Sequence, residues 1–436
     1  MGVHYNKADF ITYGRPSLFL DFANKKSLTD RISGNNLITF TRTSTGTYVG
    51  ADGLIKSATT NEARFDHNPS TRESLGLLIE DSRYNICSYS EDFSNSYWSS
   101  PTTSSGGTFT ITSNSETSPD GTLTADKCVM QVGATSVSYS YWYIKNSGYS
   151  PNGTDRWIWS FYVKSAGAPI VTIGGQHGGD RQWSFNLSTG LPVSNYGTTG
   201  DSYQYMGNGW YRLSLGWVPT LGAYGSPGVN FGCSGVTGDG NVGIYMWGAQ
   251  LEKGDFLTSY IPTPSTTVIT RSAEVPNITG TNFSSWYNQS QGTFLVKSKL
   301  LPSSGSQWGT ALETYVEGSA IANGVSIMPN YLNGGKARIE VPLAGDYTAR
   351  AIDSNSLSYS NEIKMATAIQ DNNVGLSVNG VLYNSLTNKT IAQNVTAMRI
   401  GGPRGTGGSN ILCGTISRIT YWPTRIPNSL IQSLSS

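Results

Sequence analysis

Apolar and polar side chains alternate along much of the chain, and this pattern predicts β-strands. The clearest run is RWIWSFYVK, residues 156–164, in which every second side chain from Trp157 to Val163 is apolar and faces one side of an extended segment. Similar runs are short and are separated by Gly, Asn and Ser. Residues 86–262 contain no 3.6-residue apolar repeat that lasts three turns, so we expect many short strands there instead of helices.

The second half of the chain follows the same pattern. Strands are predicted at residues 292–299, 398–401 and 414–422. Asn379-Gly380 separates two apolar runs and is a typical two-residue hairpin turn. Beyond Pro427 the tail can form one or two helical turns.

The first 85 residues contain apolar segments that are too few for a core of their own. A short strand around Leu18 comes first, and a hairpin with Asp52-Gly53 as its turn follows. The longest apolar run, residues 75–79, lies between two charged clusters and is too short to span a membrane. We therefore expect this segment to pack against a neighbour, either the next domain or another protein. The predicted contact residues are Leu18, Leu20, Phe22, Leu75, Leu77, Leu78 and Ile79.

The composition is that of an extracellular-type β protein. The 436 residues are enough for two or three domains, and only 13% of them are charged, whereas 51 are glycine and 25 are tyrosine. Disordered chains have more charge and fewer aromatic residues. A net charge of +1 without a long basic run gives no electrostatic support for a nucleic-acid partner. We also expect no signal peptide and no membrane insertion, because the sequence has neither an apolar signal region near residue 1 nor an apolar run of about 18 residues.

These patterns predict an all-β protein with two β-sandwich (jelly-roll) domains in tandem behind a short extended N-terminal anchor. The N-terminal segment is expected to cover residues 1–85 and the first sandwich residues 86–262. A linker rich in Pro, Ser and Thr follows at 263–272, and the second sandwich covers 273–436.

Three segments of the first part are FTRTSTGTYV at 40–49, RFDH at 64–67 and ESLGLLIEDSRYN at 73–85. They resemble modular bacteriophage virion proteins, mostly of the tail-fibre or host-recognition type. The middle part resembles a carbohydrate-binding-module-like sandwich through YSEDFSN at 89–95, GNGWYR at 207–212, WGAQLE at 247–252 and SYIPT at 259–263. The last part is similar to concanavalin A-like (laminin-G-like) sandwiches through the Asn379-Gly380 hairpin, RIG at 399–401 and RITYW at 418–422.

The resemblance implies a structural component of a phage particle, namely a tail fibre or receptor-binding protein that adheres to host cell-surface glycans. A capsid-attached fibre or decoration protein is one alternative, and a polysaccharide-degrading tailspike-type hydrolase is another. Such a protein is assembled in the host cytoplasm, contacts other virion proteins through its N-terminal segment and is exposed on the particle. We expect a homotrimer, because several weak sugar sites acting together raise avidity.

Neither an active site nor a cofactor is predicted. A glycosidase needs two carboxyl groups about 5–10 Å apart, and no sequence pattern places two carboxylates across one cleft. We therefore expect no enzymatic activity and no catalytic residue. Asp120, Asp126 and Glu252 are candidate ligands of a structural calcium ion, which prefers oxygen donors.

The four cysteines are widely spaced and form no CxxC pair. They are Cys87, Cys128, Cys233 and Cys413. Buried free thiols are the favoured interpretation, and a disulfide between two of the first three is the alternative.

Aromatic residues are the candidate binding groups. In YSYWY, residues 139–143, the side chains of Tyr139, Tyr141 and Tyr143 fall on one strand face. Tyrosine rings stack on the apolar faces of sugars while their hydroxyls form hydrogen bonds. Core packing or a subunit contact is the competing explanation for such a stripe. In the Gly-rich loops of the second sandwich, further candidates are Trp308, Tyr331 and Arg404.

Overall fold

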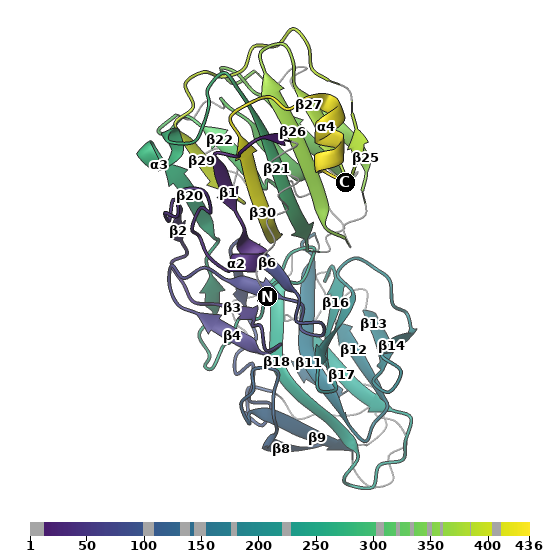
Figure 1. Cartoon of the computed structure of the whole chain (residues 1–436). Helices are drawn as coiled ribbons and strands as arrows, with labels where there is room; N and C mark the ends of the chain where they lie inside the picture. The colour runs from purple at the N-terminus through teal and green to yellow at the C-terminus, as the bar shows by residue number, and fades with distance from the viewer. Residues whose placement is uncertain are drawn as a thin grey trace.

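Strands dominate the computed structural model (Figure 1), and the predicted all-β class is confirmed. The structure describes residues 13–98, 109–130, 140–143, 154–175, 181–219, 228–301, 309–319, 323–331, 335–346, 351–357, 361–383, 385–402 and 411–436. Within these residues the helices are short: α2 (Phe22–Lys25), α3 (Gly280–Ser284) and α4 (Asn428–Leu434).

The C-terminal sandwich packs two sheets face to face. The first sheet has eight described strands. Seven of them run in the order β28 (Val381–Leu382), β27 (Gly375–Val378), β26 (Ile363–Gln370), β21 (Gln291–Leu300), β30 (Gly414–Trp422), β6 (Ser74–Ile79) and β5 (Phe65–His67). The eighth, β1 (Leu18–Leu20), also pairs with β30. The second sheet, seven-stranded over the same described part, runs β2 (Thr39–Thr41), β20 (Val275–Thr279), β29 (Ala397–Ile400), β22 (Leu312–Tyr315), β23 (Ser326–Tyr331), β24 (Lys336–Glu340) and β25 (Ala351–Ser356). Apolar residues from both sheets form one core between them.

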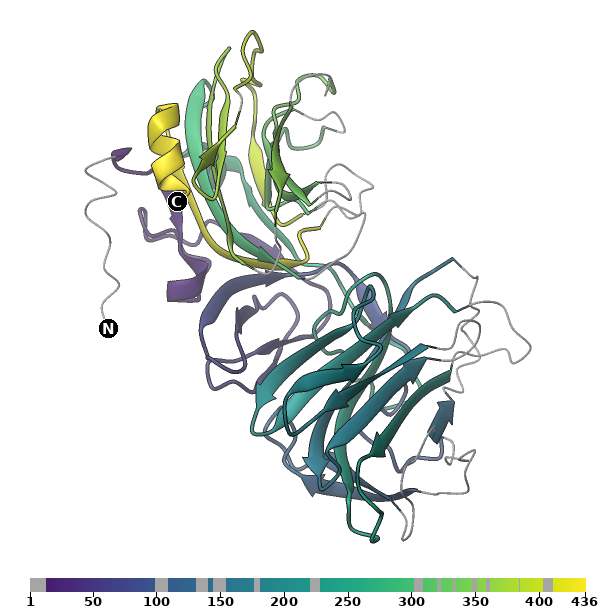
Figure 2. The ribbon, with the colours of Figure 1, turned by 90° about the vertical axis from the view of Figure 1, so that its right-hand side faces the viewer.

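The central sandwich also has two layers, visible side by side in Figure 2. Among described strands, its six-stranded sheet runs β15 (Ser202–Gly207), β16 (Trp210–Trp217), β11 (Trp157–Ala166), β18 (Gly243–Lys253), β9 (Ala125–Met130) and β8 (Phe109–Glu116). Its five-stranded sheet, counted in the same way, runs β10 (Ser140–Tyr143), β17 (Gly228–Ser234), β12 (Ile170–Gly175), β13 (Arg181–Asn186) and β14 (Leu191–Ser194). The alternating run of β11 is confirmed, because Trp159, Phe161 and Val163 all lie in the core between these sheets.

The two predicted hairpin turns and the predicted C-terminal helix are present in the structure. The Asp52-Gly53 turn joins β3 (Gly46–Val49) to β4 (Ile55–Ala58), with Val49 opposite Ile55. At Asn379-Gly380, both turn residues have positive φ (48° and 78°), as a two-residue hairpin of this kind requires. The helical tail is α4, which covers the outer face of the eight-stranded sheet.

The N-terminal strands are integral to the C-terminal sandwich. Strands β1 and β6 both pair with β30, and β2 pairs with β20. Residues that precede the central sandwich in sequence therefore share sheets with residues that follow it. In Figure 1 the N-terminal segment accordingly lies along the upper sandwich and beside its junction with the lower one. The domain limits themselves stay a prediction.

Of the two expected neighbours of this segment, the structure shows another domain of the same chain. Six of the seven contact residues are at most 3% exposed: Leu18, Leu20, Phe22, Leu77, Leu78 and Ile79. Leu75 is partly exposed. The physical reason is that β1 and β6 complete a sheet whose inner face needs apolar side chains, so the chain's own core covers them.

Buried ions join the two sandwiches. We call Arg42, Arg64, Arg271, Glu80 and Glu274 the junction ion cluster. Arg64 contacts both carboxylates, at 2.7 Å to Glu80 and 2.6 Å to Glu274. Arg42 lies 3.2 Å from Glu274, and Arg271 lies 3.2 Å from Glu80. All five side chains are at most 1% exposed, so the cluster is screened from water and its geometry is specific.

The predicted linker leads directly into this cluster. Residues 264–268 are exposed, but β19 (Ile269–Arg271) pairs with β7 (Arg83–Asn85). Glu80 also accepts hydrogen bonds from the amide and hydroxyl of Ser259, each at 2.7 Å. Segments before, within and after the central sandwich thus meet at one buried point.

Candidate functional site

One edge of the central sandwich, formed by β14 and β15, carries a group of exposed aromatic residues. We call Tyr196, Tyr203, Tyr205 and Tyr211 the tyrosine cluster. Strand β14 is an edge of the five-stranded sheet and β15 is an edge of the six-stranded sheet. Tyr196 follows β14, whereas Tyr203 and Tyr205 lie on β15. The exposed fractions of these three side chains are 41%, 36% and 41%, so each is more than one-third open to solvent.

Core aromatic residues support the cluster from below. Phe185 of β13 is fully buried, and its ring centroid lies 5.2 Å from that of Tyr203 and 4.9 Å from that of Tyr211. Tyr196 packs edge-on against the buried Trp183 at 5.1 Å. The exposed rings are therefore an extension of the core and are held in fixed orientations.

The rings also contact one another. Tyr196 lies 5.5 Å from Tyr203, and Tyr205 lies 5.1 Å from Tyr211, measured between ring centroids. The backbone amide of Gly209 donates to the Tyr205 hydroxyl at 3.3 Å. The four rings therefore form two contacting pairs at the edge of the sandwich, and the buried ring of Phe185 links the pairs.

An ion pair fixes the loop that carries Tyr196. Both terminal nitrogens of Arg181 donate to the carboxylate of Asp201, whose side chain is fully buried. Arg181 also donates to the carbonyl of Asn195, next to Tyr196. The Asp201 carboxylate in turn accepts from the backbone amides of residues 197 and 198. These contacts hold the loop against β15 and preorganise the cluster.

Burial raises the pKa of two phenols in the cluster. Partial burial, followed by the proximity of Tyr203 and Asp201, raises the pKa of Tyr196 above its ordinary value. Burial and then Tyr205 raise the pKa of Tyr211. A protonated phenol, the ordinary form of tyrosine at neutral pH, can donate as well as accept hydrogen bonds, and these shifts extend that form to higher pH.

The predicted binding residues lie elsewhere. Tyr139, Trp308 and Arg404 fall outside the described residues. Tyr141 and Tyr143 lie on β10, at the edge of the five-stranded sheet opposite to β14, and only their backbone is described.

Tyr331 is half-buried in the C-terminal sandwich, where it is part of a packed contact. The guanidinium of Arg338 lies 3.4 Å from the ring centroid of Tyr331. Its ring face is therefore engaged by a cation of this chain, and the structure does not bring it together with the tyrosines of the central sandwich.

The three calcium candidates do not converge on one ion. Asp126 accepts two backbone amides, at 2.8 and 3.0 Å. Glu252 accepts from the amide and hydroxyl of Thr258, and Asp120 accepts from nearby hydroxyls. In the described parts of the chain, no three His, Cys, Asp or Glu side chains are arranged to hold a metal ion.

The cysteines are free and buried. The favoured interpretation of the four thiols is confirmed. Burial raises the pKa of Cys233 to about 12 and that of Cys87 well above its ordinary value, so these thiols are unreactive at neutral pH.

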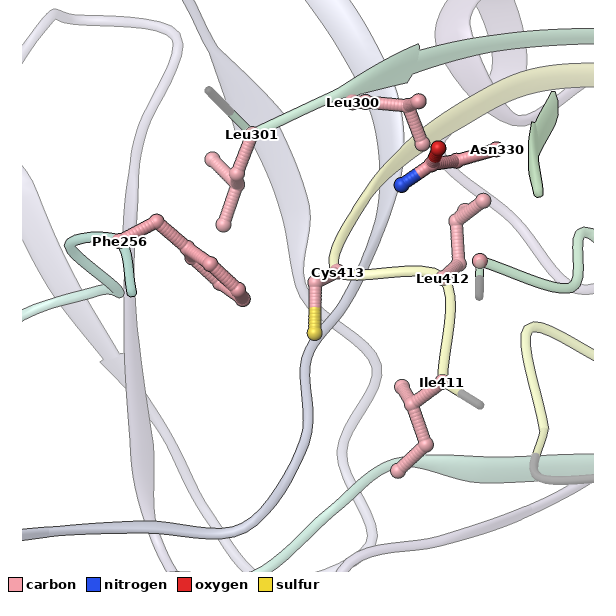
Figure 3. Close-up of a pocket in the computed structure, with 8 residues that line it drawn as sticks. Phe256, Leu300, Leu301, Asn330, Ile411, Leu412 and Cys413 are labelled. Atoms are coloured by element: carbon pink, nitrogen blue, oxygen red, sulfur yellow. The ribbon is translucent and has the colours of Figure 1, made fainter. Parts of the chain in front are cut away.

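A small recess lies near the boundary of the two sandwiches (Figure 3). Phe256 of the central unit faces Leu301, Ile411 and Cys413 of the C-terminal sandwich across it. Its lining is apolar apart from the Asn330 amide and the Cys413 thiol. A site of this kind offers few polar groups to orient a ligand, so it is a packing gap at the junction.

No helix in the described parts has the length and apolarity that a membrane span needs.

The tyrosine cluster was missed in the sequence analysis, although part of its signal is present there. Tyr203 and Tyr205 are two residues apart, just before the Gly207-Asn208-Gly209 turn, so they share a strand face. The pattern alone does not say whether that face is buried, since the alternate residues are Gln204 and Met206. The exposure of the two tyrosines depends on β15 being an edge strand, which is a property of the assembled sheet.

Comparisons with known proteins find partial matches to solved structures of low similarity. The sequence matches no protein-family model and no curated protein. Similar solved structures include the CBM40 of the Ruminococcus gnavus IT-sialidase bound to alpha2,3 sialyllactose, at 14% identity over 36% of this chain and 88% of that chain, with a TM-score of 0.30. Another is a native heptameric SAP-like pentraxin from Limulus polyphemus, at 13% identity over 34% of this chain and 70% of that chain, with a TM-score of 0.29. The fold is an all-β sandwich.

The expectation of no enzymatic activity is corrected by the same comparison. The matched structures include the NanB sialidase of Streptococcus pneumoniae, at 18% identity and a TM-score of 0.30, and sialidases of Trypanosoma rangeli. Sialidases are hydrolases, so the chain is no longer assigned to the non-enzymatic proteins. The NanB match covers 36% of this chain and 26% of that enzyme, which assigns no activity here either.

Proposed function

We propose that this chain is a glycan-binding protein of a bacteriophage particle, a tail-fibre or receptor-binding protein that adheres to host surface sugars. The observation that carries the glycan-binding part is the tyrosine cluster, a preorganised row of exposed rings on a rigid edge. The phage part rests on the sequence segments that resemble virion proteins.

Exposed tyrosines suit sugar binding for a physical reason. One side of a pyranose ring is mainly C–H and packs on an aromatic face, while phenolic hydroxyls bond to the sugar hydroxyls. Rings that are already fixed by core contacts lose little conformational entropy when a ligand binds. The packing of Tyr203 on Phe185 and of Tyr196 on Trp183 provides this rigidity.

Affinity at one such site is expected to be modest. Each ring–sugar contact resembles an aromatic pair, worth ~1 kcal/mol. Several copies on one particle raise the overall affinity by orders of magnitude, which is the reason for proposing a homotrimer. Light scattering of the purified chain measures that state directly.

The test of glycan binding compares a variant inside the cluster with one outside it. Tyr203→Ala combined with Tyr205→Ala removes two exposed rings, and Tyr84→Ala is the matched control. Tyr84 is exposed to the same extent as Tyr203, 36%, and likewise contacts a core aromatic residue, Trp157, but it lies outside the cluster. We expect the double variant to lose adhesion to host cells or extracted host polysaccharide at least about ten-fold. The control should keep it.

Equal adhesion of both variants, with both folds intact by circular dichroism, would refute the cluster as the site. Following reducing ends in the same samples reports whether bound polymer is also cleaved. The particle role is tested separately: a cryo-EM map of the phage that encodes this chain should contain its two sandwiches on the tail. Their absence from the particle would overturn the virion assignment and leave glycan binding untouched.

A further inference from the structure

We propose that the tyrosine cluster selects neutral glycans and discriminates against acidic ones. This inference rests on the proposed glycan binding and concerns the ligand class of that site. The observation behind it is that, among the residues the structure describes, three cations border the cluster, and each is already held by a carboxylate of this chain.

Arg181 is the first residue of β13, the strand whose Phe185 supports the cluster. Both of its terminal nitrogens contact Asp201, and they also donate to the carbonyls of Asn195 and Gly216. The Asp201 side chain is fully buried. Moving Arg181 toward a ligand would leave that carboxylate buried without its partner, at a cost of several kcal/mol.

Lys164 and Arg156 are engaged in the same way. The Lys164 side chain lies next to Gly209, whose amide donates to Tyr205, and its ammonium is 3.4 Å from Glu116. Arg156 donates to the carbonyl of Thr199 in the loop that follows Tyr196, and lies 3.4 Å from Asp255. Both of these pairs are partly exposed, so they are weaker than the Arg181 pair.

Recognition of an acidic sugar needs the opposite arrangement. Carboxylates and sulfates are bound through charge-assisted hydrogen bonds from a cation that faces the ligand. The described surface of the cluster instead offers neutral rings, phenols and the exposed loop residues Ser194, Asn195 and Thr198. Such a surface gains nothing from a ligand charge and pays the desolvation cost of that charge.

The experiment measures binding of the full chain to two sets of immobilised polymers at 50 and 500 mM NaCl. The neutral set is dextran, mannan and galactomannan, and the acidic set is hyaluronan, alginate and polysialic acid. We expect binding to at least one neutral polymer, at least ten-fold stronger than to any acidic one, with less than two-fold change between the two salt concentrations. Salt insensitivity follows because no ion pair forms with the ligand.

A variant with one released cation sharpens the test. Glu116→Gln removes the partner of Lys164 without touching a ring of the cluster. We expect it to bind acidic polymers several-fold better than the parent at 50 mM salt, and to bind the neutral polymer unchanged. Tyr203→Ala combined with Tyr205→Ala should abolish both.

The outcomes separate the two proposals. Binding to acidic polymers alone, lost at 500 mM salt, would overturn neutral selectivity while glycan binding stands. No binding to any polymer or to host cells would overturn the proposed function itself. Self-association of the parent that the double tyrosine variant lacks, seen by light scattering without polymer binding, would assign the cluster to a contact between copies and refute both.

Discussion

Gly76 illustrates how one residue sets the position of the N-terminal segment. It lies in β6 with φ of +100°, a conformation that side chains other than glycine rarely adopt. A Cβ atom at this position would lie 2.2 Å from the carbonyl oxygen of Ile416 and 2.7 Å from the Cα of Ser417. The missing side chain therefore allows β6 to approach β30 closely enough to extend the sheet.

The first prediction concerns this close approach. Gly76→Ala should destabilise the chain by more than ~3 kcal/mol, because it combines backbone strain with a clash against the main chain of β30. Gly34→Ala is the control, since Gly34 also has a positive φ (+76°) but an added Cβ there would meet no atom within 4 Å. It should cost only the strain, ~1–2 kcal/mol. Denaturant unfolding measures both, and equal losses would show that β6 is not tightly packed on β30.

At the scale of elements, the junction ion cluster holds β7, β19 and the ends of both sandwiches together. Burial alone would keep Glu80 protonated, but the guanidiniums of Arg271 and Arg64 and the hydrogen bonds from Ser259 outweigh it and lower its pKa to about 2. Because this pKa lies below the ordinary value of 4.5, the ionised form stabilises the folded chain above about pH 4.5. That contribution is lost as the pH falls from 4.5 toward 2. At Asp66 burial is not outweighed, and it raises the pKa of that carboxyl to about 6.

The second prediction tests the cluster as a unit. Glu274→Gln removes the charge that Arg42 and Arg64 share and leaves two buried guanidiniums with one carboxylate fewer. The expected loss in the free energy of unfolding is ~3–5 kcal/mol. Asp52→Asn breaks the exposed pair with Lys56 and should cost less than ~1 kcal/mol. A similar, small loss for both variants would mean that the buried cluster contributes little to the junction.

For the whole molecule, the chain enters the C-terminal sandwich, leaves it to build the central sandwich and then returns. Strands β1, β2, β5 and β6 precede the central sandwich in sequence, and β20 to β30 follow it. Their pairing means that the two sandwiches are connected by shared sheets as well as by the linker. The exposed stretch 264–268 is the part of the linker open to a protease.

The third prediction follows from this connectivity. Limited proteolysis should cut within 264–268, and the two fragments should still elute together from a native sizing column, because each contributes strands to the same sandwich. They should separate only in denaturant. Elution as two independent folded fragments would contradict the shared sheets, and cutting chiefly within 157–217 would contradict the central sandwich.

Much of this protein follows from short-range pattern in the sequence. Period-two alternation in β11 identified a strand and its core face, and the turns at Asp52-Gly53 and Asn379-Gly380 identified their hairpins. These features depend on the conformational preferences of neighbouring residues, so they can be predicted without knowing the fold. The all-β class follows from the same preferences.

Only the tertiary structure decided which strands pair and which faces remain exposed. Leu18 and Leu77 were expected to contact either the next domain or another protein, because nothing in the local sequence indicates that β30, more than 300 residues later, completes their sheet. The pattern around Tyr203 and Tyr205 does not distinguish a buried face from an exposed one, and they are exposed because no further strand pairs beyond β15 among those described. Sheet neighbours and edges are set by hydrogen bonds between distant segments, and a one-dimensional pattern carries no record of them.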